Sequence, residues 1–354
     1  MLPEENKPLA PFTTFGIGGP ARWFVTAVSE RDIAEATAWA REQNVPLFVL
    51  GGGSNLLVSD AGFPGLVVHV GLRGIEMERE PGRANYRVAA GEDWDKFVER
   101  AVRDQCAGIE CLAGIPGTAG GTPVQNVGAY GQEVASTIDR VRAFDVARQS
   151  FVEFSAAECG FAYRRSRFNS VDRGRYIVTR VDYRLTPGGA PMLRYADLQR
   201  AFPEDTVPSL ADVAQAVRRV RQSKGMLLVE ADPDCHSAGS FFKNPVVAED
   251  VVRNIAAASG KEPPRFTAGQ DLENAGRVKV PAAWLIEQSG FSKGYARGAA
   301  GISSRHTLAL INRGGATAAD ILALADEIRS AVESRFGIRL EMEPVLLGFD
   351  RVAD

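Results

Sequence analysis

The sequence has few of the residues that bind metals or form disulfides. Its 354 residues include only four cysteines and three histidines. Cys106, Cys111, Cys159 and Cys235 show no C-x-x-C spacing, and no HExxH motif occurs, so we expect no structural zinc site and no bound metal. Four scattered cysteines are better explained as buried, reduced thiols of a cytoplasmic protein.

Strong charge and long apolar runs are also missing. The formal net charge is −3 and no basic tract stands out, so neither nucleic acid nor an anionic membrane is an expected partner. No apolar run reaches the roughly 18 residues of a membrane-spanning helix. Residues 1–15 contain neither the basic nor the apolar region of a secretory signal. We therefore expect a cytoplasmic protein.

Composition and periodicity indicate a globular chain of two or three domains. The sequence is 45% hydrophobic and 24% charged, enough for more than one core. Apolar residues spaced three or four apart predict helices, with Ser29 and Thr317 as N-caps. The predicted helices cover approximately residues 29–43, 91–105, 209–224, 281–290 and 317–332. The predicted strands cover approximately residues 46–50, 86–90, 141–146 and 176–186, and an apolar run covers 23–28.

A glycine-rich stretch at 108–134, GIECLAGIPGTAGGTPVQNVGAYGQEV, is the most unusual part of the chain. Its glycines leave main-chain N–H groups unshielded, so such a loop can wrap a diphosphate closely. A mobile surface loop is the alternative interpretation. Burial is favoured by the apolar residues among the glycines, which are Ile109, Leu112, Ile115, Val124 and Val127.

A second candidate phosphate loop, GGGSNLLVSD, occupies 51–60 directly after a predicted strand. It does not fit the Rossmann fingerprint, because Leu56 stands at the sixth position, where that motif has Gly or Ala. The residues after Leu56 indicate strand and turn rather than helix. We therefore expect the phosphates in a loop and not at a helix N-terminus. No GxxxxGK[ST] motif occurs, which argues against a P-loop nucleotidase.

Two further patterns stand in the C-terminal part. Ser240 lies between Gly239 and two phenylalanines in SAGSFFKNPVV, but no GxSxG motif supports a hydrolase nucleophile. Glu341 and Glu343 alternate with apolar residues, so the two carboxylates share one face of a strand.

Six motifs, taken together and in order, resemble the UDP-N-acetylenolpyruvoylglucosamine reductase family. They are TFGIGGPA, GGGSNLLVSD, GIPGTAGGTPVQNVGAYG, YRRSRF, GSFFKNP and LEMEPV, and they extend from about residue 12 to 350. The segment LRYADL, 193–198, is similar to the form of the family that has an extra substrate-covering loop. The resemblance implies an FAD- and NADPH-dependent enzyme that makes UDP-N-acetylmuramate for bacterial peptidoglycan.

The resemblance also implies an α+β fold. It consists of a two-lobed FAD-binding domain of the vanillyl-alcohol-oxidase type, with FAD between the lobes, and a C-terminal α+β substrate domain that closes over the flavin ring. The expected ranges are 1–74 for the first lobe, 75–205 for the second lobe, 206–340 for the substrate domain and 341–354 for a C-terminal strand and tail. We expect a monomer whose partner is a small-molecule substrate.

Residue roles follow from the same resemblance. Arg164, Ser240 and Glu343 match the catalytic residues, with Ser240 as proton donor. The expected FAD contacts are Gly51, Gly52, Gly53, Ser54, Asn55, Leu56, Ile115, Pro116, Gly117, Gly120, Gly121, Asn126 and Gly128. The expected substrate contacts are Tyr130, Tyr163, Tyr195, Lys224, Asn244 and Gln288.

Two departures from the family pattern affect these assignments. The segment between Lys224 and Ser240 is a few residues longer than in the commonest form of the family, which weakens the match of Lys224. Pro344 follows the second glutamate, whereas some relatives have proline between the two, so Glu343 is preferred over Glu341 without being settled. A different FAD-dependent oxidoreductase and a non-catalytic nucleotide-sugar binding protein remain alternatives to the reductase.

Overall fold

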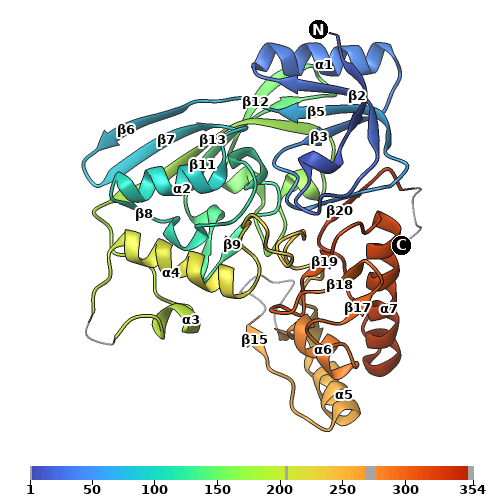
Figure 1. The fold of residues 1–354 in the computed structure, drawn as a ribbon. Coiled ribbons are helices and arrows are strands. Elements are labelled where there is room, and N and C mark those ends of the chain that lie inside the picture. The colour runs from blue at the N-terminus through green and yellow to red at the C-terminus, as the bar shows by residue number, and fades with distance from the viewer. Residues whose placement is uncertain (1, 204–205, 268–275, 350–354) are drawn as a thin grey trace. The chain divides into compact units, whose positions relative to one another are not determined.

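A computed structural model describes residues 2–203, 206–267 and 276–349 (Figure 1). The chain divides into two compact units. The first comprises 1–7, 20–53 and 63–223, and the second comprises 8–19, 54–62 and 224–354. Each unit consists of three separate chain segments, whereas each expected domain is one continuous range. The expected ranges stay predictions. No helix of the described residues has the length and apolar character needed to cross a membrane.

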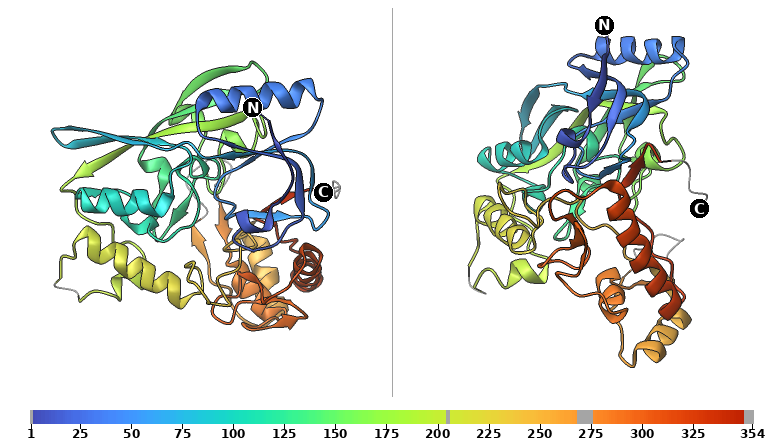
Figure 2. Two further views of the ribbon diagram at one scale, coloured as in Figure 1. Left: turned by 45° about the horizontal axis from the view of Figure 1, so that its top comes forward. Right: turned by 45° about the vertical axis from the view of Figure 1, so that its right-hand side comes forward.

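The first unit begins with a four-stranded sheet in the order β1 (Glu4–Pro8), β2 (Pro20–Ala27), β5 (Phe63–Val70) and β3 (Leu47–Leu50). β5 pairs in parallel with both β2 and β3. Helix α1 (Glu30–Glu42) lies against this sheet (Figures 1 and 2). It begins where predicted, because the Ser29 hydroxyl and the Asp32 carboxylate form a capping box that satisfies two free amides.

The second sheet of this unit has the order β12 (Ser150–Ser155), β11 (Ile138–Asp145), β13 (Tyr176–Pro187), β7 (Arg83–Ala89) and β6 (Ile75–Glu80), and β8 (Cys106–Ala107) also pairs with β13. All of these pairings are antiparallel. One face packs on α2 (Trp94–Arg103), where Trp94 and Phe97 are fully buried. Their rings lie 5.7 and 5.1 Å from the Tyr183 ring, so aromatic packing supports the predicted helical stripe.

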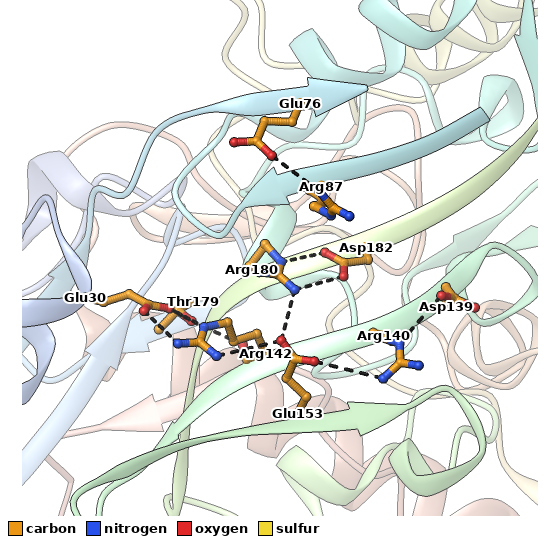
Figure 3. Close-up of polar contacts among 10 residues, drawn as sticks. All are labelled: Glu30, Glu76, Arg87, Asp139, Arg140, Arg142, Glu153, Thr179, Arg180 and Asp182. Atoms are coloured by element: carbon orange, nitrogen blue, oxygen red, sulfur yellow. Dashed lines mark hydrogen bonds and ion pairs between the residues drawn. The ribbon is translucent and has the colours of Figure 1, made fainter. Parts of the chain in front are cut away.

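The other face of the second sheet is charged (Figure 3). We call it the charged sheet face; it is formed by Glu76, Arg87, Asp139, Arg140, Arg142, Glu153, Arg180 and Asp182. Arg142 binds both carboxylate oxygens of Glu30, the first residue of α1, at 2.7 and 3.0 Å. Thr179 also donates to Glu30 at 2.8 Å. The start of α1 is therefore fixed to strands of the second sheet.

The first unit ends with two helices, α3 (Ala196–Gln199) and α4 (Leu210–Ser223). α4 was predicted at 209–224, and its buried face contains Val213 and Val217. It packs on α2 and on the 3-10 turn η2 (Glu110–Leu112) of the glycine-rich stretch. The same stretch contributes a short hairpin of β9 (Gly128–Ala129) and β10 (Gln132–Glu133).

The second unit has its own core and, among its described residues, three small sheets. β4 (Leu56–Val58) pairs in parallel with β20 (Val345–Leu347). The second sheet consists of β17 (Ala296–Arg297), β18 (Ala300–Ile302) and β19 (Leu310–Asn312), and the third of β14 (Val246–Ala248), β16 (Arg277–Lys279) and β15 (Phe266–Thr267). Its helices are α5 (Glu249–Ser259), α6 (Ala282–Gln288) and α7 (Ala318–Phe336).

Capping distinguishes α7, which was predicted, from α5, which was not. Thr317 and Asp320 form a capping box at α7, and the Asp60 carboxylate accepts from the amides of Ala318 and Ala319 at 2.8 and 3.1 Å. α5 was not predicted, because Ala248 at its N-cap makes no side-chain cap bond and the buried residues of the helix are two, Val252 and Ile255.

Candidate active site

The glycine-rich stretch 108–134 is part of the core and not a solvated linker. Ile109 and Leu112 are fully buried, and Ile115, Val124 and Val127 pack against the core of the first unit. Gly114 and Gly117 have positive φ values of 71° and 132°, which glycine adopts without steric cost. The prediction of an ordered loop is confirmed.

The two predicted phosphate loops contact each other inside the first unit. A Cβ placed on Gly52 would lie 2.6 Å from the Cα of Gly117, and one on Gly51 would lie 2.9 Å from the Thr118 hydroxyl. A Cβ on Gly120 would lie 2.5 Å from the Cβ of Ala90. Such separations are shorter than any ordinary contact, so the close approach of the two loops depends on glycine at 51 and 52, and the approach of residue 120 to Ala90 depends on glycine at 120.

This approach leaves several main-chain donors available. Within the described ranges, no hydrogen bond engages the amides of Gly51, Gly52 and Gly53, or those of Ile115, Gly117 and Thr118. The amide of Gly120, in contrast, donates to Ala90 at 2.9 Å. Unengaged amides on side-chain-free backbone suit an anionic diphosphate. The residues present therefore fit the pyrophosphate of FAD.

Other predicted cofactor residues have structural roles as well. The Asn126 side chain is buried and bonds to Glu133 at 2.9 Å, to the carbonyl of Ala162 at 3.1 Å and to the amide of Ala135 at 3.1 Å. It therefore fixes the far half of the glycine-rich stretch, and its direct contact with FAD stays a prediction. Gly121 and Gly128 lie in the same stretch, and Pro116 precedes Gly117.

Arg164 lies beside that far half. Its Nη1 donates to the carbonyl of Gly128 at 3.0 Å. Its φ is 54°, a value uncommon for residues other than glycine, and such conformations cluster at functional sites. The side-chain Nδ2 of Asn169 donates to the Arg164 carbonyl at 3.1 Å and supports this turn. The neighbouring Tyr163 ring lies 5.8 Å from the Arg164 guanidinium, measured to the ring centre.

Segment 193–198, which resembles the substrate-covering loop of the family, contacts the glycine-rich stretch through two aromatic rings. Tyr130 and Tyr195 are 5.3 Å apart between ring centres and nearly perpendicular. Tyr130 is buried, whereas Tyr195 is 42% exposed. Tyr130 adopts a positive φ of 50°. The structure thus brings these two predicted substrate contacts together.

Arg221 is a residue of this region that the sequence interpretation missed. It is buried at the end of α4, and its Nε donates to the carbonyl of Gly114 at 2.9 Å. Burial lowers its pKa, and Tyr130, to which it is hydrogen-bonded, opposes that shift. The sequence contained a signal for the burial of Arg221, because this residue follows Ala214 and Val217 at the spacing of one helical face and both of these are buried.

In the second unit, Ser240 and Glu343 lie on neighbouring segments. The Glu343 amide donates to the Phe241 carbonyl at 2.9 Å, and Phe242 and Met342 form an antiparallel bridge. Ser240 and Glu343 are both half-buried. The Asn55 side chain donates to the Glu343 carbonyl at 3.3 Å, and Leu56 pairs with Val345. The structure therefore connects the segment after the GGG loop to the strand of the predicted acid.

The remaining predicted residues of this unit lie on adjoining elements. The Asn244 Oδ1 accepts from the Ala282 amide at 2.9 Å, so this side chain caps α6. Gln288 ends α6, and its carbonyl accepts from Arg335. Lys224 begins the last of the three chain segments of this unit and is half-buried. Lys243 forms an ion pair with Glu341, a partner that the sequence did not reveal.

All four cysteines are free and buried. Burial raises the pKa of the Cys111 and Cys159 thiols, in each case to about 12. Neither thiol is therefore a nucleophile at neutral pH, and the expectation of buried thiols is confirmed.

Comparison with known proteins defines the class first. A family described as "FAD binding domain" matches residues 21–150. A second family, described as the C-terminal domain of UDP-N-acetylenolpyruvoylglucosamine reductase, matches residues 232–347. Together with the two glycine-rich loops, these matches make the chain an FAD-dependent oxidoreductase. The α+β fold, with an FAD-binding domain followed by a second α+β domain, agrees with the predicted class.

Individual relatives identify the family. Proteins named UDP-N-acetylenolpyruvoylglucosamine reductase from Thermobifida fusca and Streptomyces coelicolor are 48% and 46% identical, each over 97% of this chain and over 98% and 90% of their own length. The crystal structure of the enzyme from Thermus caldophilus is 26% identical and superposes with a TM-score of 0.68 over 98% of this chain and 100% of its own. The chain belongs to the UDP-N-acetylenolpyruvoylglucosamine reductase family, and the resemblance seen in the motifs is confirmed.

Proposed function

We propose that this protein reduces the enolpyruvyl group of UDP-N-acetylenolpyruvoylglucosamine with NADPH and forms UDP-N-acetylmuramate for peptidoglycan synthesis. The observation that carries the proposal is its similarity to reductases of that name along nearly the whole chain. The amides of the two contacting loops supply a binding surface for FAD. We further propose that the protein acts in the cytoplasm as a monomer on this small-molecule substrate.

Held by the main-chain amides of the two glycine-rich loops, FAD would supply the hydride chemistry through which a hydride of NADPH reaches C3 of the enolpyruvyl double bond. Negative charge then develops at C2 and spreads into the substrate carboxylate. Arg164 would stabilise that charge, because its guanidinium is permanently cationic and is held by the Gly128 carbonyl, while the Asn169 side chain holds its backbone carbonyl. Removing one such electrostatic contact typically raises a barrier by about 3–4 kcal/mol.

Ser240 would deliver the proton that C2 requires. An alcohol is a weak acid, so it needs a partner that replaces the proton or stabilises the alkoxide. Lys243 is a cation three residues after Ser240, but its ammonium pairs with Glu341. Glu343 would donate a hydrogen bond to the developing enolate, which requires that its carboxyl group be protonated. The neighbouring segments of Ser240 and Glu343 support their joint action.

The substrate contacts belong to both units and stay predictions from the family pattern. Tyr130, Tyr163 and Tyr195 belong to the first unit, and Lys224, Asn244 and Gln288 to the second. The side chain of Asn244 already accepts the first amide of α6 through its oxygen, so its amino group is the part available to a ligand.

An anaerobic two-stage measurement tests the function. The purified, FAD-loaded protein is first reduced by NADPH and then mixed with UDP-N-acetylenolpyruvoylglucosamine, and the visible flavin absorbance is followed. We expect bleaching in the first stage and full recovery in the second, with one product molecule formed per flavin. Recovery with oxygen but not with the substrate would indicate another flavin oxidoreductase. Protein that binds the UDP-sugar but contains no flavin would indicate a non-catalytic binding protein.

A further inference from the structure

The segment between Lys224 and Ser240 contains an ionic cluster that the proposed reaction does not use. Arg305 binds two aspartates of this segment, Asp234 through Nε at 3.1 Å and Asp232 through Nη2 at 2.5 Å. The hydroxyls of Ser303 and Ser304 donate to Asp234 at 2.9 and 2.7 Å. The side chains of Asp232 and Asp234 are only 15% and 8% exposed. We call these five residues the Arg305 cluster.

Both aspartates are held in the ionised form. The hydrogen bond from Arg305 lowers the pKa of Asp232. Burial opposes ionisation of Asp234, but hydrogen bonds from Ser304, Ser303 and Arg305 outweigh it and lower the pKa of Asp234 overall. A buried carboxylate that lost its cationic partner would carry a large desolvation cost, so the cluster constrains the backbone strongly.

At its first end, the segment touches the Arg305 cluster directly after Lys224. Gly225 has a positive φ of 65°, and a Cβ placed on it would lie 3.0 Å from the Asp234 Cβ and 3.2 Å from the Arg305 Nε. The backbone next to Lys224 is thus packed against the guanidinium without an intervening side chain. The position of Arg305 therefore limits where Lys224 can lie.

At its other end, the segment is bound to the same turn that carries the cluster. The Phe241 amide donates to the Leu308 carbonyl at 2.7 Å, three residues after Arg305. The Ser303 hydroxyl accepts from the amides of Arg305 and His306 and so shapes this turn. The Gly239 amide donates to the Ser237 hydroxyl at 3.2 Å. Ser240 therefore lies between two residues whose backbone is fixed.

We propose that Arg305 is a positioning residue that places both Lys224 and Ser240 for the reaction. It acts through Asp232 and Asp234 and touches neither the substrate nor the cofactor. The consequence for catalysis rests on the proposed function, in which Lys224 binds the substrate and Ser240 protonates it. A displacement of about 1 Å at a reacting group can slow a reaction about a hundredfold, so a positioning error is measurable.

Arg305→Met tests the proposal, because it removes the charge and keeps an apolar side chain of similar reach. Arg305→Lys is the conservative variant that restores one cation. Arg265→Met is the matched control, since Arg265 belongs to the same unit, is 46% exposed and pairs with the exposed Glu249 and Glu262. Each FAD-loaded variant is reduced anaerobically with NADPH and reoxidised with a range of concentrations of UDP-N-acetylenolpyruvoylglucosamine. Thermal midpoints are measured in parallel.

We expect Arg305→Met to be reduced by NADPH at the wild-type rate. Its reoxidation at saturating substrate should be slower by about tenfold or more, and the half-saturating substrate concentration should rise. Arg305→Lys should have a reoxidation rate and a half-saturating substrate concentration close to those of the wild type. Arg265→Met should equal the wild type in both. Asp232→Asn keeps the side-chain shape, and its reoxidation rate should lie between those of Arg305→Lys and Arg305→Met. It provides the test if Arg305→Met does not fold.

Two results would overturn the proposal. One is a lowered thermal midpoint with wild-type reoxidation kinetics in the Arg305 and Asp232 variants, since this would make the cluster only a stabilising element. The other is an equal slowing of reduction and reoxidation. Failure of the proposed function would look different, because wild-type protein would then not be reoxidised by this substrate at all.

Discussion

The main-chain amide of Glu343 donates to the carbonyl of Phe241 over 2.9 Å, which places Glu343 beside the residue that follows Ser240. The amide of Lys243 likewise donates to the carbonyl of Glu341 at 2.9 Å. Two segments almost 100 residues apart in the sequence therefore run antiparallel at this point. Because both belong to the second unit, Ser240 and Glu343 are held relative to each other by its own hydrogen bonds.

These contacts separate the roles of the two glutamates. Glu341 is 70% exposed and pairs with Lys243, whereas Glu343 is half-buried. We expect Glu341→Gln to leave turnover near the wild-type value, since exposed ion pairs contribute only about 0–1 kcal/mol. Glu343→Ala should slow flavin reoxidation by the substrate about a hundredfold or more.

Glu343→Gln distinguishes a protonated acid from a carboxylate. The amide of glutamine can still donate a hydrogen bond to the enolate, so this variant should retain more activity than Glu343→Ala. Single-turnover reoxidation after reduction by NADPH gives the rates of all three variants. If Glu341→Gln were the slow variant and Glu343→Ala resembled the wild type, the assignment of the acid would be reversed.

Local signals were sufficient to predict much of the secondary structure. Ser29 and Thr317 mark α1 and α7 because each begins a capping box, and the stripe from Trp94 to Val102 identifies α2. Strand β7 was predicted at 86–90, whereas its hairpin partner β6 and strand β12 were missed, because their outward side chains are charged and their apolar alternation is weak. The passage of 8–19 and 54–62 into the second unit depends on long-range pairings, such as β4 with β20, that no local pattern encodes.

For the candidate site too, local features could be predicted and long-range contacts could not. Glycine composition indicated both phosphate loops, since close backbone approach requires residues without a side chain. The contact of Gly52 with Gly117 could not be predicted, because it joins residues 65 positions apart through the fold. The pairing of Lys243 with Glu341 was invisible for the same reason. No local sequence pattern connected Arg305 to Asp232 and Asp234, because these residues meet only through the fold.

Ser240→Ala separates the two half-reactions of the proposed function. The variant should be reduced by NADPH at nearly the wild-type rate, because that step needs no proton at C2 of the substrate. Its reoxidation by the substrate should be slower by about two orders of magnitude or more, since general acid catalysis commonly contributes that much. Stopped-flow absorbance of the flavin measures both rates. Equal slowing of the two steps would contradict the role of Ser240 as proton donor.

Substitutions at two glycines separate loop packing from cofactor contact. Gly52→Ala places a methyl group 2.6 Å from the Gly117 Cα, so we expect the flavin-free protein to lose about 1–3 kcal/mol of stability and to retain little FAD. At Gly121 the nearest atom to a new Cβ is the Thr118 hydroxyl at 3.8 Å, which is an ordinary contact. Gly121→Ala should therefore change the stability of the flavin-free protein by no more than about 0.5 kcal/mol.

Denaturant unfolding of the flavin-free variants and FAD titration by fluorescence give the two quantities independently. Weaker FAD binding by Gly121→Ala at unchanged stability would locate the cofactor against Gly121. Wild-type stability and FAD affinity in Gly52→Ala would show that the two loops need not touch for the cofactor to bind.

Glu30 should make the stability of the first unit depend on acidity. The hydrogen bond from Arg142 is the main cause that lowers the pKa of Glu30 from 4.5, with burial opposing it and Thr179 assisting. A lowered folded-state pKa means that the contribution of Glu30 is complete above about pH 4.5 and is lost as the pH falls through the lower folded value. Glu30→Gln should therefore destabilise the protein at neutral pH, by about 1 kcal/mol.

The measurement is urea unfolding of wild type and Glu30→Gln from neutral pH down through 4.5 and below. The difference between the two proteins should stay constant at neutral pH and narrow only in the acidic range, because protonated Glu30 and glutamine are both neutral there. Glu35→Gln is the control on the same helix; its side chain is 37% exposed and pairs with Arg31, which is 86% exposed, so it should destabilise the protein less than Glu30→Gln does. A wild-type advantage that persisted undiminished below the folded pKa would mean that packing of α1, and not the charge pair with Arg142, fixes the helix to the second sheet.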